Sequence, residues 1–413
     1  MAGSGRIAGH RGIWAEGFMD LAGRRTDLLS SPGANAQLAR DALARRGTRG
    51  IPSQACNLMV VPLLEELAGR PPGSYAREPE AVYRDSLLAW GACCCDQWIP
   101  RNPLSMAEAG FSAGARRGST TGAEVVVVDG VAIDSAEAVA EHLERIAFPR
   151  LEQAAAAIDL TDEAGIAAAV AELVRREAET QGFFGPDLLK APYGEGFQAI
   201  PTFAYQTYGY QHYFTAYGLY PDVLERHFAL QVDLGVKVHT VAARAYREGG
   251  LPLALRLDHD MCDSRGPLVG LRSLERLWFP HFARSLAPLL AAGVQLLWHC
   301  DGNVMPMVPG LLACGVTGFQ GFQYEHGVDY VRLCRMTGRD GAPLAIWAGV
   351  SVSTTLPHGT REDVRRELAW LVEHGPRVGL FLGASSSIAP GTNPENVRTF
   401  LEGLRYYRER GRG

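Results

Sequence analysis

The chain has 413 residues, of which 47% are hydrophobic and 21% charged, and its formal net charge is −5. This composition is typical of an ordinary soluble globular protein, and a pI near 6.1 leaves no basic footprint for nucleic acid. No apolar run approaches the roughly 20 residues that span a bilayer, and the N-terminus lacks a signal-peptide pattern. We therefore expect a cytoplasmic protein whose eight cysteines stay reduced.

The first part of the chain, residues 1–50, is rich in Ala, Arg and Gly and has helical spacing over 34–43. We predict a helical lead-in there and a single domain over residues 51–413. Cys93, Cys94 and Cys95 point in different directions on any regular element. They are therefore expected to be small core residues rather than metal ligands.

The next part of the domain begins with a β-like stretch near residues 51–62. Two helices follow, one around 63–67 and one over 79–90. Residues 105–185 then interrupt the pattern, and we interpret them as an insertion. The insertion holds a hairpin about Asp129-Gly130, a dipeptide typical of tight β-turns, and a helix-rich section.

From about residue 190 short apolar runs alternate with amphipathic stretches, which favours parallel strands separated by helices. The six runs are 197–203, 251–257, 294–298, 316–322, 344–349 and 378–382. With two candidate strands before residue 100 they make eight. We therefore predict an α/β fold, a (β/α)₈ TIM barrel, with a doubly wound open sheet as the alternative. No G-x-G-x-x-G segment follows these strands, which disfavours a dinucleotide site.

In a barrel, reactive groups lie at the carboxyl ends of the strands. Four predicted strands end in polar segments: 258–260, 299–303, 323–327 and 383–387. His299 and Asp301 stand two residues apart and so face one side. They could bind zinc or another divalent ion, form a metal-free acid/base pair, or only hold the loop.

Asp258 and Asp260 also share one face, where they could act as acid and base, bind a cation or cap a turn. Glu325 is a candidate third metal ligand beside His299 and Asp301. Further candidates for a substrate pocket lie on the same strand ends and in a tyrosine-rich stretch: Tyr205, Tyr210, His259, Asn303, Gln323 and Ser386.

Four segments in order resemble the uroporphyrinogen decarboxylase superfamily, which includes the decarboxylase and zinc-dependent methyltransferases that use corrinoid proteins or coenzyme M. They are Leu257-Asp-His-Asp260, His299-Cys-Asp-Gly-Asn303, Trp347-Ala-Gly-Val350 with Leu356-Pro-His-Gly-Thr360, and Ala389-Pro-Gly-Thr-Asn-Pro-Glu-Asn-Val397. The resemblance is firm from about residue 190. It implies a (β/α)₈ barrel and a homodimer.

The sequence departs from both familiar branches of that family. The decarboxylase's arginine-rich segment is replaced by residues 51–59, which hold no arginine, whereas the resemblance places its active-site aspartate at Asp96. In the methyltransferase comparison His299 keeps its place, Asp301 stands where a cysteine would be, and Ser386 replaces the later cysteine. A His/Asp site is harder than a thiolate site and is expected to hold zinc more weakly, a different ion, or none.

Three functions follow from these residues. The first is metal-assisted methyl transfer on a small molecule, with a corrinoid protein as partner. The second is a metal-free decarboxylase or lyase that uses Asp96, Asp258, Asp260 and His299 for proton transfer on a small carboxylated substrate. The third is a barrel that binds a ligand without turnover.

Overall fold

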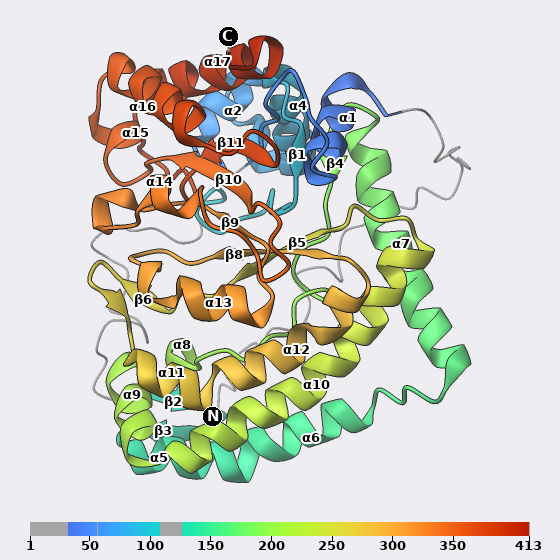
Figure 1. The fold of residues 1–413 in the computed structure, drawn as a ribbon, viewed down its shortest axis with the longest axis vertical. Helices are drawn as coiled ribbons and strands as arrows, with labels where there is room; N and C mark the ends of the chain where they lie inside the picture. Colours follow the sequence, from blue (N-terminus) through green and yellow to red (C-terminus); the bar gives the residue numbers. More distant parts are fainter. Residues whose placement is uncertain (1–31, 56, 108–125, 413) are drawn as a thin grey trace, which may run out of the picture.

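The computed structural model describes residues 32–55, 57–107 and 126–412, and a parallel five-stranded sheet lies at its centre (Figure 1). The sheet has the order β11-β10-β9-β8-β5. Its strands are β5 (Ala254–Asp258), β8 (Gln295–His299), β9 (Gly318–Gln320), β10 (Ala345–Val350) and β11 (Leu380–Ala384). Asp258 pairs with His299 in register, so two polar strand ends become neighbours.

Short parallel bridges continue the strand arrangement beyond β11. Ser53 bridges Leu382, and Gln54 bridges Cys94 of β1 (Cys94–Cys95). β1 in turn pairs with β4 (Leu189–Lys190). No ladder joins β4 to β5 among the described residues.

Side chains, rather than a strand, occupy the outer edge of β5. The Gln198 amide accepts from the backbone N–H of Asp258 at 3.1 Å and donates to its carbonyl at 2.9 Å. The hydroxyl of Tyr246 donates to the carbonyl of Ala254 at 3.0 Å. These bonds satisfy backbone groups that would otherwise be unpaired at the edge.

Helices surround the sheet on both sides. In Figure 1, α16 and α17 lie above the strands, and α10 and α12 run below them. The helices of the N-terminal half are α1 (Ala34–Leu43), α2 (Val61–Leu67), α3 (Ser74–Arg77), α4 (Pro79–Trp90), α5 (Ala136–His142), α6 (Phe148–Ala156), α7 (Glu163–Phe184), α8 (Tyr205–Tyr208), α9 (Tyr210–Leu219) and α10 (Pro221–Glu248). Those of the C-terminal half are α11 (Leu271–Leu277), α12 (Phe279–Ala291), α13 (Val308–Cys314), α14 (Tyr330–Leu333), α15 (Thr355–His358), α16 (Arg361–His374) and α17 (Pro394–Arg410). None of the helices in the described ranges is long and apolar enough to cross a membrane.

The strands enclose a small apolar cluster that is separate from the main core. It contains Cys93, Cys94, Leu297, Trp347 and Phe381, among others, and α1 closes it with Ala36, Ala39, Ala42 and Leu43. Small side chains on the strands make room for Trp347 and for the helix. The three consecutive cysteines are fully buried, as predicted.

Five of the six predicted strands are confirmed, and the one at 197–203 is wrong. That segment forms a turn and then an irregular stretch. Phe197 and Phe203 are buried in the main core, so their apolar character serves packing rather than a strand. The strand in this part of the chain is instead β4, whose two residues are too few to show a hydrophobic period.

The predicted hairpin forms as β2 (Val126–Val128) and β3 (Val131–Ile133), with Asp129 and Gly130 at φ 52° and 81°. Two positive φ values are what a type I′ turn requires. Residues 124 and 125 lie outside the described part of the chain.

Candidate functional site

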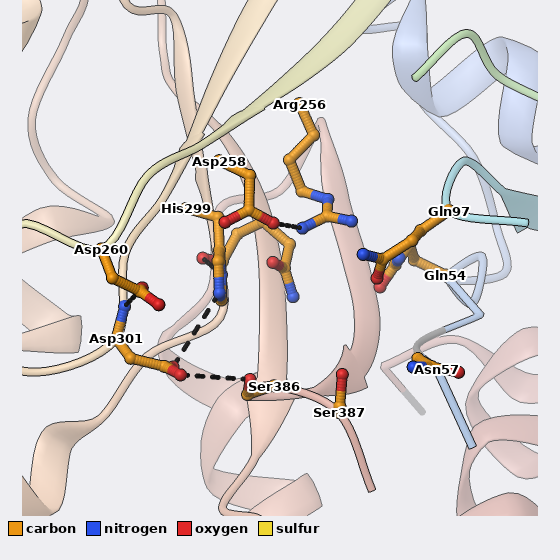
Figure 2. Close-up of a pocket in the computed structure, with 11 residues that line it drawn as sticks. Gln54, Asn57, Gln97, Arg256, Asp258, Asp260, His299, Asp301, Ser386 and Ser387 are labelled. Atoms are coloured by element: carbon orange, nitrogen blue, oxygen red, sulfur yellow. Dashed lines mark hydrogen bonds and ion pairs between the residues drawn. The ribbon is translucent and has the colours of Figure 1, made fainter. Parts of the chain in front are cut away.

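A polar cavity of about 190 Å³ lies where β5, β8, β9 and β11 end (Figure 2). Eleven side chains line it: Gln54, Asn57, Gln97, Arg256, Asp258, Asp260, His299, Asp301, Gln320, Ser386 and Ser387. None of the described residues of 105–185 is among them. The cavity therefore belongs to the strand ends themselves.

A buried ion-pair network holds the β5 side of the cavity. The guanidinium of Arg256 donates to Asp96 at 2.7 Å and to Asp258 at 2.9 Å, and it stacks on the ring of Tyr193. The Tyr193 hydroxyl donates to the same Asp258 oxygen, Oδ2, at 3.0 Å. Burial would raise the pKa of Asp258, but His299 and Arg256 outweigh it and lower that pKa. Asp258 is thus held as a carboxylate.

His299 presents one ring nitrogen to the cavity. Its Nδ1 lies 3.2 Å from the carbonyl oxygen of Gln320, an atom that can only accept, so Nδ1 carries the proton. Nε2 is then the ring nitrogen left to face the cavity, and it lies 3.9 Å from Asp301 Oδ1. A backbone carbonyl that fixes the tautomer in this way is the usual support of a metal-binding histidine.

Asp301 faces His299 from the loop that follows β8. Gln323 donates to its Oδ1 at 3.2 Å, and the hydroxyl of Ser386 lies 3.4 Å from its Oδ2. Burial raises the pKa of Asp301, and the carboxylates of Asp260 and Asp258 add to the rise while His299 opposes it. Gly302 follows at φ 87°, a backbone conformation that turns the chain sharply after the aspartate.

Asp258, Asp260 and His299 form a group that fits a divalent ion. One ligand atom from each lies within 4.8 Å of the others. In Figure 2 these side chains converge from the ends of β5 and β8, with Asp301 beside them. Two carboxylate oxygens and one imidazole nitrogen suit zinc, manganese or iron(II).

Thiolates do not take part in this group. Cys300 accepts from the backbone N–H of Met261 and lies 3.2 Å from the carbonyl oxygen of Asp301. It is buried and does not line the cavity. The donor set of this group is therefore harder than a cysteine site.

Glu325 lies apart from the group of possible ligands. It falls in the short helical turn Tyr324–His326, and its Oε1 accepts from the hydroxyl of Ser351 at 2.7 Å. The turn rotates consecutive side chains, so strand alternation does not carry over to Glu325. Of the predicted ligands, only His299 belongs to this group, in which Asp258 and Asp260 stand in place of Asp301 and Glu325.

Several predicted pocket residues support the site without lining it. His259 accepts from the N–H of Phe203 at 2.9 Å, and burial lowers its pKa to about 4. Tyr205 donates to the carbonyl of Asp260 at 2.8 Å, and Tyr210 packs against the Tyr205 ring. Asn303 accepts from the N–H of Met305. Asp96 is buried behind Arg256 and also does not line the cavity.

Arg256 is the main residue that the sequence prediction missed. It was counted within the apolar run 251–257, yet Leu255 and Leu257 alternate with it. A charged residue two positions before Asp258 was the available signal, because strand alternation aims both to one side. Five neutral lining residues were also missed: Gln54, Asn57, Gln97, Gln320 and Ser387.

Comparison with known proteins gives a likeness in fold. No family model matches the chain, and no curated protein matches it. A solved structure described as a methyltransferase from Methanosarcina mazei matches with a TM-score of 0.53 and 16% identity, covering 92% of this chain and 99% of that chain. A B12-independent methionine synthase from Shewanella sp. W3-18-1 covers 44% of this chain and 55% of its own, at 14% identity and a TM-score of 0.26, too low to support an argument. The chain thus shares its fold with an enzyme described as a methyltransferase.

Proposed function

We propose that this protein is a divergent uroporphyrinogen decarboxylase-like barrel enzyme that binds one divalent metal ion and transfers a methyl group to or from a small molecule. The fold likeness to a methyltransferase over 92% of the chain supports the reaction class. The observation that carries the proposal is the convergence of Asp258, Asp260 and His299 within 4.8 Å.

The barrel in this proposal has eight strands. Five come from the central sheet, and the bridged segment at 53–54, β1 and β4 supply three more. Side chains of Gln198 and Tyr246 stand where the ladder between β4 and β5 would close it. The domain then runs over 51–413, with 1–50 as a lead-in and 105–185 as an insertion.

Different residues of the site would bind the metal ion and accept the proton. Asp258, Asp260 and His299 would hold the ion, which when bound supplies Lewis acidity to a coordinated substrate atom. In methyl transfer the acceptor gives up a proton and bonds to the methyl carbon, while the bond from that carbon to the donor breaks and its electron pair stays with the donor. Asp301 lies beside His299, with its Oδ1 3.9 Å from Nε2, and would accept that proton. Ser386 and Gln323 keep its carboxylate in position.

Metal analysis of the purified full chain tests the ion site. We expect about one equivalent of a divalent metal in the wild type and a loss of affinity of at least about tenfold in His299→Gln. His358→Gln, which removes an exposed histidine on α15, is the matched control and should keep the metal. A metal-free wild type, with metal addition producing no binding heat, would refute the site.

A corrinoid assay tests the reaction itself. We propose a corrinoid protein as partner, and free methylcobalamin with a thiol acceptor serves as its simplest substitute. Demethylation is followed by the change in the corrinoid absorption spectrum. If the metal-loaded protein shows no turnover, methyl transfer to thiols is refuted, whereas the proposed ion site is not. A homodimer is a separate expectation, which sedimentation tests.

The metal-free lyase is the second candidate, and the pair of Asp301 and His299 favours it. A carboxyl with a raised pKa at 3.9 Å from an imidazole nitrogen is suited to proton transfer without an ion. Carbon dioxide release from small carboxylic acids by metal-free protein would establish this reaction instead.

A further inference from the structure

An unsatisfied acceptor at the end of β9 bears on the substrate. Gln320 lines the cavity and is only 4% exposed. Its Oε1 is buried and has no hydrogen-bond donor among the residues that the structure describes. A buried acceptor without a donor costs free energy, and a bound molecule with an O–H or N–H group would relieve that cost.

The hydrogen-bond network fixes which atom of the Gln320 amide is left over. The Nε2 group lies 3.4 Å from the carbonyl oxygen of Ala384. Exchanging the two amide atoms would set Oε1 against that carbonyl, and two acceptors repel each other. The remaining group is therefore an acceptor, and the matching group on the substrate is a donor.

The charge of the cavity argues against an anionic substrate. Its lining holds three aspartates and one arginine. Arg256 is already paired with Asp96 and Asp258. No guanidinium of the lining is thus left for a carboxylate or phosphate. With the proposed divalent ion bound, the formal charges of the three aspartates, Arg256 and the ion cancel, so the lining does not require a cationic substrate either.

The neutral part of the lining favours hydroxyl groups. Amide and hydroxyl side chains make up more than half of it: Gln54, Asn57, Gln97, Gln320, Ser386 and Ser387. Amide side chains both donate and accept hydrogen bonds. A hydroxyl group does the same, so it can pair with an amide N–H or with an amide oxygen. The cavity has a volume of about 190 Å³, which suits a small molecule.

From these features we infer that the site takes a small, uncharged, polyhydroxylated molecule, one hydroxyl of which donates to Gln320 Oε1. This inference rests on the proposed function and names its substrate class. Gln320 is then a residue that determines specificity: its side chain selects for a donor, while its backbone carbonyl separately orients His299.

Calorimetric titration of the full chain, with its metal content measured first, tests this inference. Erythritol is the neutral probe, glycerate the anionic one and ethanolamine the cationic one. We expect erythritol to bind the wild type, and to bind about tenfold or more weakly to Gln320→Met, which keeps the side-chain length but removes the acceptor.

The controls separate this inference from the metal proposal. Gln211→Met alters an exposed glutamine on α9 and should bind erythritol as the wild type does. Gln320→Met should keep both its metal and its unfolding midpoint close to those of the wild type. Equal erythritol affinity in Gln320→Met and the wild type would overturn the inference, as would binding of glycerate or ethanolamine without binding of erythritol. Erythritol binding that depends on Gln320 in a protein without metal would uphold it while refuting the ion site.

Discussion

Replacing Arg256 by methionine tests the buried network behind the site. The substitution keeps much of the side-chain volume but removes the cation that contacts Asp96 and Asp258. Arg256 and Asp96 are only 4% and 1% exposed, so water cannot replace the lost partner. Breaking a buried ion pair in this way costs about 3–5 kcal/mol of folding free energy. The cation–π contact with Tyr193 is lost as well.

Urea unfolding followed by circular dichroism measures this loss. Arg256→Met should unfold at a clearly lower urea concentration than the wild type. The double variant Arg256→Met/Asp96→Asn should recover part of the loss, because it removes one of the stranded carboxylates. Arg265→Met is the matched control: its pair with Asp263 is exposed, and no measurable shift is expected. An Arg256→Met midpoint equal to that of the wild type would refute the assigned role of the network.

Three further predictions concern separate parts of the molecule. Asn396→Ala should lower the free energy of unfolding by about 1–3 kcal/mol in urea titrations, because its buried amide donates to the carbonyls of Leu356 and Gly359; an unchanged midpoint would contradict this. Gly302→Ala should weaken metal binding in calorimetry, because a Cβ at φ 87° would lie 2.5 Å from the carbonyl oxygen of Asp263, whereas Gly47→Ala meets nothing and should bind like the wild type. Burial lowers the pKa of His239 from 6.5 to about 4, so the unfolded chain takes up a proton that the folded one refuses. The contribution of His239 to stability should therefore be complete above pH 6.5 and fall by about 1.4 kcal/mol per unit toward pH 4, and a pH series of His239→Gln with an undiminished slope would count against this.

The sequence was most informative where strands are long and buried on both faces. β10 and β11 are apolar throughout their length, so their runs stand out from the amphipathic helices around them. β1 and β4 have two residues each, which leaves no period to detect. The aromatic segment at 197–203 was mistaken for a strand because burial alone does not distinguish a strand from a packed loop.

The same reasoning explains the success and failure at the site. Spacing by two residues correctly placed Asp258 with Asp260 and His299 with Asp301 in one cavity. No such spacing supported Glu325, which lies at a helical turn where the backbone has left the extended conformation. It could not indicate Gln54 or Asn57, because their place in the cavity depends on contacts with β1 and β11 that are distant in sequence.

The hydrogen bonds that Gln198 makes at the edge of β5 have a consequence for the ion site. Gln198 binds both backbone groups of Asp258, one of the proposed ligands, so any local opening of this edge must displace that ligand. The position of Asp258 as a ligand and the local opening of the β5 edge then depend on the same equilibrium between a closed and an open form. A metal ion that binds only the closed form should slow hydrogen exchange at the Asp258 amide by the same factor by which it populates that form. Hydrogen exchange at this edge of β5 would in that way report whether the metal ion is bound.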